Sequence, residues 1–384
     1  MAEKERNYGI DLLRITSMMM VITLHVLGRG GGLTGLKNLT FKGEIGWLMS
    51  IACYGAVNCY ALISGYVGVG AKHRYSSIIQ LWIQVLFYSL LSSVIVNVMN
   101  VVNGGSISFG DLLGSCLPVF MQKYWYFTAY FALFFFMPLL NHIINTAPKK
   151  VLKSAFLAAV ALFFVIESVR ETFDLAGGYS FLWLAILYLI GGYIAKYKPF
   201  ENWAAKRCFL AYFVCVLAIS LSRIAIALVT RAVLGSIQHE NFFLGYVDFF
   251  VVFGAIFLVL GFSKLNVTGT KMRRLISWVS PLTFGVYLAH LTPLVWDWLY
   301  GRFVFFAQYN TVIIVALTVG IVLAIFVVCA LIDFLRLQLF KLFKIKKFSA
   351  WLEKWIGKLI ALVLKFLRIR IDEEPSNTTN EINE

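Results

Sequence analysis

The sequence predicts an all-α integral membrane protein built as a bundle of about ten transmembrane helices. Of its 384 residues, 60% are hydrophobic and only 14% are charged, whereas soluble domains carry about 25% charged residues. Apolar runs of about 20 residues, the length that crosses the hydrocarbon core of a bilayer, recur along the whole chain. The six cysteines show no metal-ligand or disulfide-framework spacing, so we expect neither a metal site nor a disulfide scaffold.

Each apolar run is expected to form one span. We place the ten spans at 8–28, 46–68, 76–98, 122–144, 152–169, 180–196, 207–230, 243–263, 279–299 and 311–333. The first run contains Asp11 and Arg14 and has no small-residue cleavage site, so we interpret it as a retained helix rather than a signal peptide. No internal repeat of fixed period is visible, which weakens a transporter interpretation.

The distribution of positive charge predicts the orientation. If the N-terminus is cytoplasmic, the inner loops collect most of the loop cations, such as Lys72, Arg74, Arg273 and Arg274, while the segment after the third span has no Lys or Arg. This asymmetry predicts that both termini are cytoplasmic. The net charge of +15 therefore fits orientation and anionic lipid, and we expect no nucleic-acid partner.

The chain divides into three parts. We expect residues 1–333 to form the transmembrane domain, 334–371 to form a basic amphipathic helix on the inner leaflet, and 372–384 to form a disordered acidic tail. Within the first part, residues 111–122 are expected to be re-entrant or interfacial and lead into an aromatic segment with Trp125 and Tyr126. Those aromatics fit an interface belt and the lining of a site equally well.

Arg14 and His25 lie on one face of the first predicted helix. Eleven residues return to within about 20° of the starting direction and cover about 16 Å along the axis. Arg14 fits an anion arriving from the cytoplasm, with Asp11 three residues away to neutralise it, and His25 fits proton transfer because imidazole titrates near neutral pH. The alternative is that Arg14 extends to the headgroups and His25 is a packing residue.

Other polar residues in or beside the spans fit either a structural or a functional role. His290 lies about 15 Å in from Ser280 on the ninth span. Arg223 and Asp248 come out at similar depth, so they are expected to pair across two helices, most simply as a structural ion pair. The cluster with Arg74 at the end of the second span suits either a polyanionic cytoplasmic ligand or topological anchoring.

Five elements in order resemble the acyltransferase family 3 of bacterial integral-membrane enzymes, which modify carbohydrates and lipid-linked sugars. They are Asp11-Leu-Leu-Arg14, the Arg14 to His25 spacing, Ser64-Gly65-Tyr66, Trp125-Tyr126-Phe127 leading to Pro138, and Phe284-Gly285-Val286-Tyr287-Leu288-Ala289-His290. The resemblance covers most of 8–333. It implies ten membrane helices, a multi-pass location in the bacterial plasma membrane, an acyl-coenzyme A donor from the cytoplasm, and an acceptor hydroxyl on a glycan. It departs from the family at Lys72-His73-Arg74, which is shorter than the arginine-rich motif expected there.

The sequence therefore suggests a membrane-embedded O-acyltransferase that moves an acyl group, acetyl being favoured, from acyl-CoA to a polysaccharide or lipid-linked sugar. Arg14 and His25 are the expected catalytic residues. The expected substrate-binding residues are Asp11, Arg74, Trp125, Tyr126, Arg223 and His290. No permanently bound cofactor is expected, and the expected partners are acyl-CoA, the glycan acceptor, membrane lipids and glycan-assembly enzymes. His25 suits general base catalysis or a covalent acyl-histidine relay. The alternatives are a polysaccharide or lipid-linked sugar exporter, and a structural subunit.

Overall fold

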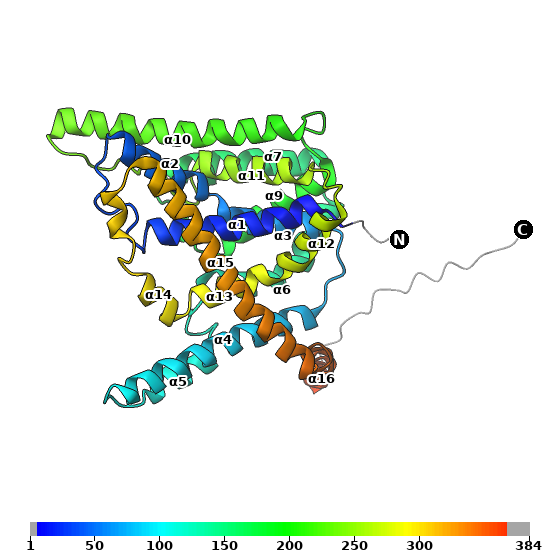
Figure 1. Cartoon of the computed structure of the whole chain (residues 1–384). Helices are drawn as coiled ribbons and strands as arrows, with labels where there is room; N and C mark the ends of the chain where they lie inside the picture. Colours follow the sequence, from blue (N-terminus) through cyan, green and yellow to red (C-terminus); the bar gives the residue numbers. More distant parts are fainter. Residues whose placement is uncertain (1–5, 367–384) are drawn as a thin grey trace, which may run out of the picture.

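The computed structural model describes residues 6–366 of the chain, and within them every regular element is helical. Figure 1 shows most helices running side by side, with α15 crossing them obliquely. The helices are α1 (Tyr8–Leu27), α2 (Phe41–Cys53), α3 (Ala56–Gly68), α4 (Tyr75–Val102), α5 (Phe109–Cys116), α6 (Trp125–Thr146), α7 (Lys149–Ala159), η1 (Val160–Ile166), α8 (Glu167–Val169), η2 (Ala176–Gly178), α9 (Phe181–Tyr197), α10 (Ala205–Leu234), α11 (Phe249–Ser263), α12 (Thr270–Val279), η3 (Ser280–Leu282), α13 (Thr283–His290), α14 (Pro293–Leu299), η4 (Val304–Gln308), α15 (Thr311–Leu342) and α16 (Ile345–Phe366).

The predicted spans coincide with helices. Seven helices of the described chain are long and apolar enough to cross a membrane, one further pair of helices is bent by 72°, and α9 and α11 are shorter apolar helices. Every one of the ten predicted spans overlaps one of these elements. The number of helices that cross the membrane and the cytoplasmic location of both termini stay predictions.

The ninth predicted span, 279–299, is not one continuous helix. Helix α13 ends at His290 and α14 begins at Pro293, with the chain bent by 72° between the two arms. Proline has no amide hydrogen and excludes the helical conformation from the residue before it. Thr292 accordingly has an extended ψ of 145°. The break places His290 at the last position of the first arm.

Helix α15 extends beyond residue 333, where the last span is expected to end. Helix α15 continues to Leu342, and the basic amphipathic helix α16 begins only at Ile345. Asp333 is fully buried, and Arg336, which is 6% exposed, donates to it from two guanidinium nitrogens at 2.9 and 2.7 Å. A buried cation paired with a carboxylate explains how α15 continues past the predicted end of the span.

Asp333 also joins α15 to α4. Its Oδ1 accepts hydrogen bonds from Gln84 Nε2 at 3.1 Å and from the Tyr88 hydroxyl at 3.0 Å. A Cβ added to Gly285 would lie 1.8 Å from the Asp333 carboxyl group, so only glycine leaves room for the cluster. The C-terminal part of α4, residues 91–102, is mostly exposed, and Figure 1 shows α4 and α5 extending away from the bundle. The cluster therefore fixes the middle of α4 to the bundle.

Small residues allow the central helices to approach closely. A Cβ on Gly65 of α3 would lie 1.9 Å from the Tyr188 carbonyl oxygen of α9, and a Cβ on Gly191 of α9 would lie 2.0 Å from the Leu62 carbonyl oxygen of α3. Close backbone contact of this kind is the usual basis of helix association in membranes. Helix α1 contacts α3, α11 and α15, so the helix with Arg14 and His25 lies at the centre.

The basic helix α16 packs against the beginning of α4. Glu353 of α16 accepts a hydrogen bond from the Tyr75 amide at 2.9 Å and so caps the first turn of α4. The large apolar side chains of α16, including Trp351 and Trp355, are exposed. The location of α16 on the inner leaflet stays a prediction, and the expected disordered tail at 372–384 lies outside the described residues.

Candidate active site

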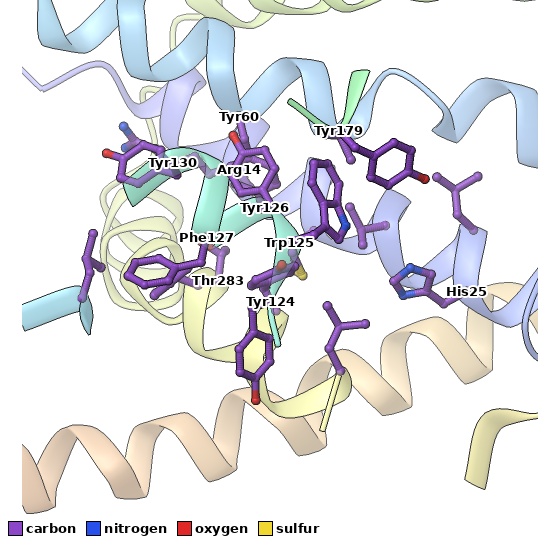
Figure 2. A pocket seen from close by; sticks show the side chains of 18 of the residues that line it. Arg14, His25, Tyr60, Tyr124, Trp125, Tyr126, Phe127, Tyr130, Tyr179 and Thr283 are labelled. Atoms are coloured by element: carbon purple, nitrogen blue, oxygen red, sulfur yellow. The ribbon is translucent and has the colours of Figure 1, made fainter. Parts of the chain in front are cut away.

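One cavity of about 640 Å³ contains both residues that the sequence singled out on the first helix. Arg14 and His25 line it from α1, and α3, α4, α6, α13 and α14 supply most of the remaining wall. Figure 2 shows Arg14 at one end and His25 at the other, with Trp125 and Tyr126 between them. The shared helical face predicted from the spacing is therefore the face that lines the cavity.

The Arg14 end is held by a buried carboxylate. Asp11, 4% exposed, accepts from Arg14 Nη1 and from Arg6 Nε, both at 2.5 Å, and from the Ser280 hydroxyl at 3.2 Å. The Tyr60 hydroxyl donates to the Arg14 carbonyl at 2.8 Å. Because only one guanidinium nitrogen of Arg14 is engaged by Asp11, the group is fixed in place with donors left for a ligand.

The middle of the cavity carries hydroxyl groups that no protein atom satisfies. The hydroxyls of Tyr126 and Tyr287 are enclosed and make no hydrogen bond to any part of the described chain. Helix α6 begins here at Trp125 without a side-chain cap, so the partial positive charge of its first amides faces this region. Buried polar groups are normally paired, and unpaired donors that line a cavity are suited to a bound polar group.

The His25 end contains a pair of histidines. His25 Nδ1 lies 3.0 Å from His290 Nε2, and His290 Nδ1 lies 2.7 Å from the Val286 carbonyl oxygen. His290 is fully buried, whereas His25 is partly exposed to the cavity. Trp296 of α14 presents its ring edge-on to the His25 ring at 4.9 Å between centroids. The imidazole is thus held from two sides.

An aromatic group lies near the same end of the cavity. The rings of Trp125 and Tyr179 are 4.4 Å apart between centroids, and those of Tyr179 and Tyr246 are 5.3 Å apart. Tyr179 and Tyr246 stand in the segments immediately before α9 and α11. We call Trp125, Tyr179 and Tyr246 the aromatic wall of the cavity.

The structure brings together six of the eight residues predicted for the site. Arg14, His25, Trp125 and Tyr126 line the cavity, and Asp11 and His290 stand directly behind the two catalytic candidates. Arg74 does not line the cavity: it is exposed and immediately precedes α4. Its neighbour His73 has its ring 4.3 Å from that of Phe134, and partial burial lowers the pKa of His73 against the opposing effect of Glu353.

Arg223 is not part of the cavity, and the expected pair with Asp248 is wrong. Arg223, 1% exposed, donates to Glu44 at 2.8 Å and to Asn38 at 2.6 Å, and its guanidinium lies over the Trp47 ring. Asp248 instead accepts a hydrogen bond from the amide of Gly245. Arg223 therefore joins α10 to α2 and to the segment before α2. Its ion-pair partner is Glu44, and not Asp248, which was expected to lie at a similar depth.

Several cavity residues escaped the sequence analysis. Tyr179 and Tyr246 precede short helices and belong to no periodic pattern, so only the tertiary fold brings them to the cavity. Trp296 lies beyond the break in the ninth span, and Pro293 was the signal that would have revealed the break. Tyr287 belongs to the Phe284–His290 motif, but the enclosure of its hydroxyl depends on tertiary packing, which sequence periodicity does not reveal.

Comparison with known protein families agrees with this geometry. The model of acyltransferase family 3, described as an acyltransferase domain, matches residues 7–333, which is most of the chain. The chain belongs to this family. It is therefore a multi-pass membrane acyltransferase, and every residue that lines the cavity falls within the matched range. Searches of curated proteins and of solved structures found no match to this acyltransferase.

Proposed function

We propose that the protein moves an acyl group, namely acetyl, from acyl-coenzyme A to a hydroxyl of a cell-envelope polysaccharide or lipid-linked sugar at the bacterial plasma membrane. The observation that carries the proposal is the single cavity with Arg14 at one end and His25 at the other. The two residues are about 16 Å apart along one helix. A long, thin thioester carrier and a separate acceptor can thus meet from opposite ends.

The charge distribution supports a polyanionic donor at the Arg14 end. Coenzyme A carries several phosphate charges, and Arg6 and Arg14 flank Asp11 at this end of α1. Arg273 lies close by, with its guanidinium 5.2 Å from the Tyr8 ring centroid. Such a cluster of cations concentrates an anion before it enters the cavity. In this proposal the Arg14 end opens to the cytoplasm, and Arg14 binds a phosphate or holds the pantetheine arm.

The hydroxyl acceptor is activated by His25 in the proposed reaction. His25 Nε2 takes the proton of the sugar hydroxyl while the oxygen forms a bond to the thioester carbonyl carbon. The carbon–sulfur bond then breaks, and the departing thiolate of coenzyme A takes the proton from His25. Negative charge builds on the carbonyl oxygen between these steps. The unpaired Tyr126 hydroxyl and the first amides of α6 are suited to stabilise it.

The aromatic wall supports a carbohydrate at the His25 end. The faces of aromatic rings carry partial negative charge, and the C–H bonds of a sugar ring carry partial positive charge, so the two stack favourably. Trp125 and Tyr246 offer nearly parallel rings, with 20° between their planes. In this proposal, a sugar bound on these rings directs one hydroxyl toward His25, which lines the same cavity. Glycan export without acyl transfer has less support, because the described chain contains one bent helix pair and no symmetric counterpart.

The test is acyl transfer by the purified protein in lipid nanodiscs. Labelled acetyl-coenzyme A and, separately, labelled succinyl-coenzyme A are supplied with a preparation of cell-envelope glycan, and free thiol and labelled glycan are both measured. The wild-type protein is expected to transfer acetyl, and His25→Ala is expected to abolish transfer while keeping expression and insertion. His142→Ala is the matched control because His142 is exposed and lies outside the cavity.

Two results would contradict the proposal. Normal acetylation by His25→Ala would remove His25 from the reaction. Transport of glycan across vesicles by a wild-type protein that never releases coenzyme A would favour the exporter. Rapid acid quenching distinguishes the two catalytic routes, because only a covalent relay leaves labelled acyl on His25.

A further inference from the structure

We propose that His290 is a positioning residue that fixes the protonation pattern of His25, so that the nitrogen of His25 facing the cavity is the free base. This inference rests on the proposed role of His25 as a general base. It concerns a three-member chain that runs from the Val286 carbonyl through His290 to His25.

The direction of the chain follows from its first member. A carbonyl oxygen only accepts hydrogen bonds, so His290 Nδ1, at 2.7 Å from the Val286 oxygen, must carry a hydrogen. In a neutral imidazole the other nitrogen, Nε2, then has a lone pair and accepts. His25 Nδ1, at 3.0 Å from that atom, must therefore donate. With its hydrogen on Nδ1, a neutral His25 has an unprotonated Nε2.

The placement of the two rings makes this assignment chemically useful. His290 is fully buried and has no direct access to the cavity, whereas His25 lines the cavity. His25 Nε2 makes no hydrogen bond within residues 6–366 and is not among their enclosed unpaired atoms. The free lone pair therefore belongs to the nitrogen that a substrate hydroxyl can reach.

The same chain acts after proton transfer. When His25 Nε2 takes the proton of the acceptor, the ring becomes a cation and its Nδ1–H becomes a stronger donor to His290 Nε2. In hydrolytic triads a third group holds the base in the correct tautomer and stabilises its cation. Here the imidazole of His290 orients His25 without carrying a negative charge. This arrangement avoids placing an unpaired carboxylate inside the membrane.

The position of His290 in the chain explains how its ring is held. His290 is the last residue of α13, and its Nδ1 bonds to the carbonyl of the residue one turn earlier in the same helix. The Tyr287 ring lies 6.3 Å from the His290 ring. After the bend, α14 brings the Trp296 ring to within 4.9 Å of the His25 ring between centroids. Both arms of the broken span therefore contact the same imidazole.

The first test reads the protonation pattern directly. The protein is labelled with ¹⁵N-histidine, reconstituted in lipid, and studied at neutral pH by solid-state NMR, in which protonated and unprotonated ring nitrogens resonate far apart. The chain has five histidines, and the His25 signals are those lost in His25→Ala. The expected result is a protonated Nδ1 and an unprotonated Nε2. A hydrogen on Nε2 of His25 in the wild-type protein would overturn the proposal.

Two variants of His290 connect the pattern to the reaction. His290→Gln retains an amide oxygen that accepts from His25 Nδ1, so it is expected to keep the tautomer and lose about tenfold in kcat. His290→Leu removes the acceptor, and a base with an unfixed tautomer is expected to lose about 10³-fold in kcat, given the effect of misprotonation in triads. The KM for acyl-coenzyme A should stay within twofold for both variants, because donor binding lies at the Arg14 end. A general packing defect would change KM as well.

The readouts separate this inference from the proposed function. Wild-type protein that shows the expected tautomer but transfers no acyl group supports the role of His290 and contradicts the proposed reaction. If the wild-type protein is active and His290→Leu keeps both the His25 tautomer and the wild-type kcat, the proposed role of His290 is wrong while the proposed reaction stands. Should His290→Leu fail to fold, the wild-type spectrum and His290→Gln still decide the matter.

Discussion

Asp11 fixes Arg14 from one helical turn away. Its carboxylate accepts from Arg14 Nη1 at 2.5 Å and from Arg6 Nε on its other oxygen, and it is itself almost fully buried. A carboxylate bracketed by two guanidinium groups leaves a net positive charge at this end of the cavity. In the proposed mechanism, Arg14 is thus presented to an anionic ligand in one orientation, with little conformational entropy left to lose on binding.

This relationship predicts different effects for the two residues. Arg14→Ala is expected to raise the KM for acyl-coenzyme A by about 10- to 100-fold, the loss of one hydrogen bond to a charged group. Asp11→Asn keeps the cation but loosens it, so we expect an increase of about two- to tenfold. Steady-state kinetics in nanodiscs measures both, with Arg231→Ala on the edge helix α10 as the control. An unchanged KM in Arg14→Ala would show that the donor does not bind there.

The unpaired hydroxyl of Tyr126 gives a second prediction. Because this hydroxyl has no partner in the described protein, Tyr126→Phe is expected to leave the free energy of unfolding unchanged or slightly higher. If the hydroxyl stabilises charge on the thioester carbonyl, kcat should fall by about 10²-fold. Denaturant unfolding and kcat measured on the same preparation test both parts. Tyr212→Phe is the contrasting control, since the Tyr212 hydroxyl donates to the Ala52 carbonyl at 2.6 Å and its removal should cost stability.

Arg223 gives a prediction of the opposite kind. Its guanidinium is buried and bonded to Glu44, Asn38 and Asn241, so Arg223→Ala should lower the free energy of unfolding by about 3 kcal/mol. The kcat and KM of the folded fraction should not change, because Arg223 is outside the cavity. The double variant Arg223→Ala with Glu44→Gln should recover part of the stability. A selective change in KM for the glycan would instead return Arg223 to the binding site.

The positions of the helices, and the placement of Arg14 and His25 along one side of the cavity, could be predicted from the sequence because both depend on local periodicity. Apolar runs located the spans, and the helical repeat placed Arg14 and His25 on one face. The partner of Arg223 could not be found in this way, since depth alone does not tell which neighbouring helix approaches. Glu44 lies outside the predicted second span, 46–68, so the span prediction does not offer it as a partner within the membrane.

The relation between the two histidines illustrates the same limit. Both residues were singled out from their position in apolar segments, and 265 positions separate them in the chain. Their contact depends on the bend after α13 and on the packing of α1 against α13. The bend had a local signal in Pro293, but the direction of the turned arm is set by tertiary packing.

The two short helices have a consequence for the distance that an acyl group must travel. Helix α9 has 17 residues and α11 has 15, so they measure about 26 and 22 Å against a hydrocarbon core of about 30 Å. If each of these helices crosses the bilayer, neighbouring segments must complete the crossing, and Tyr179 and Tyr246 stand in the segments that immediately precede them. In the proposed reaction, a sugar that approaches beside these segments would have less hydrocarbon to cross before it reaches the cavity that Tyr179 and Tyr246 line.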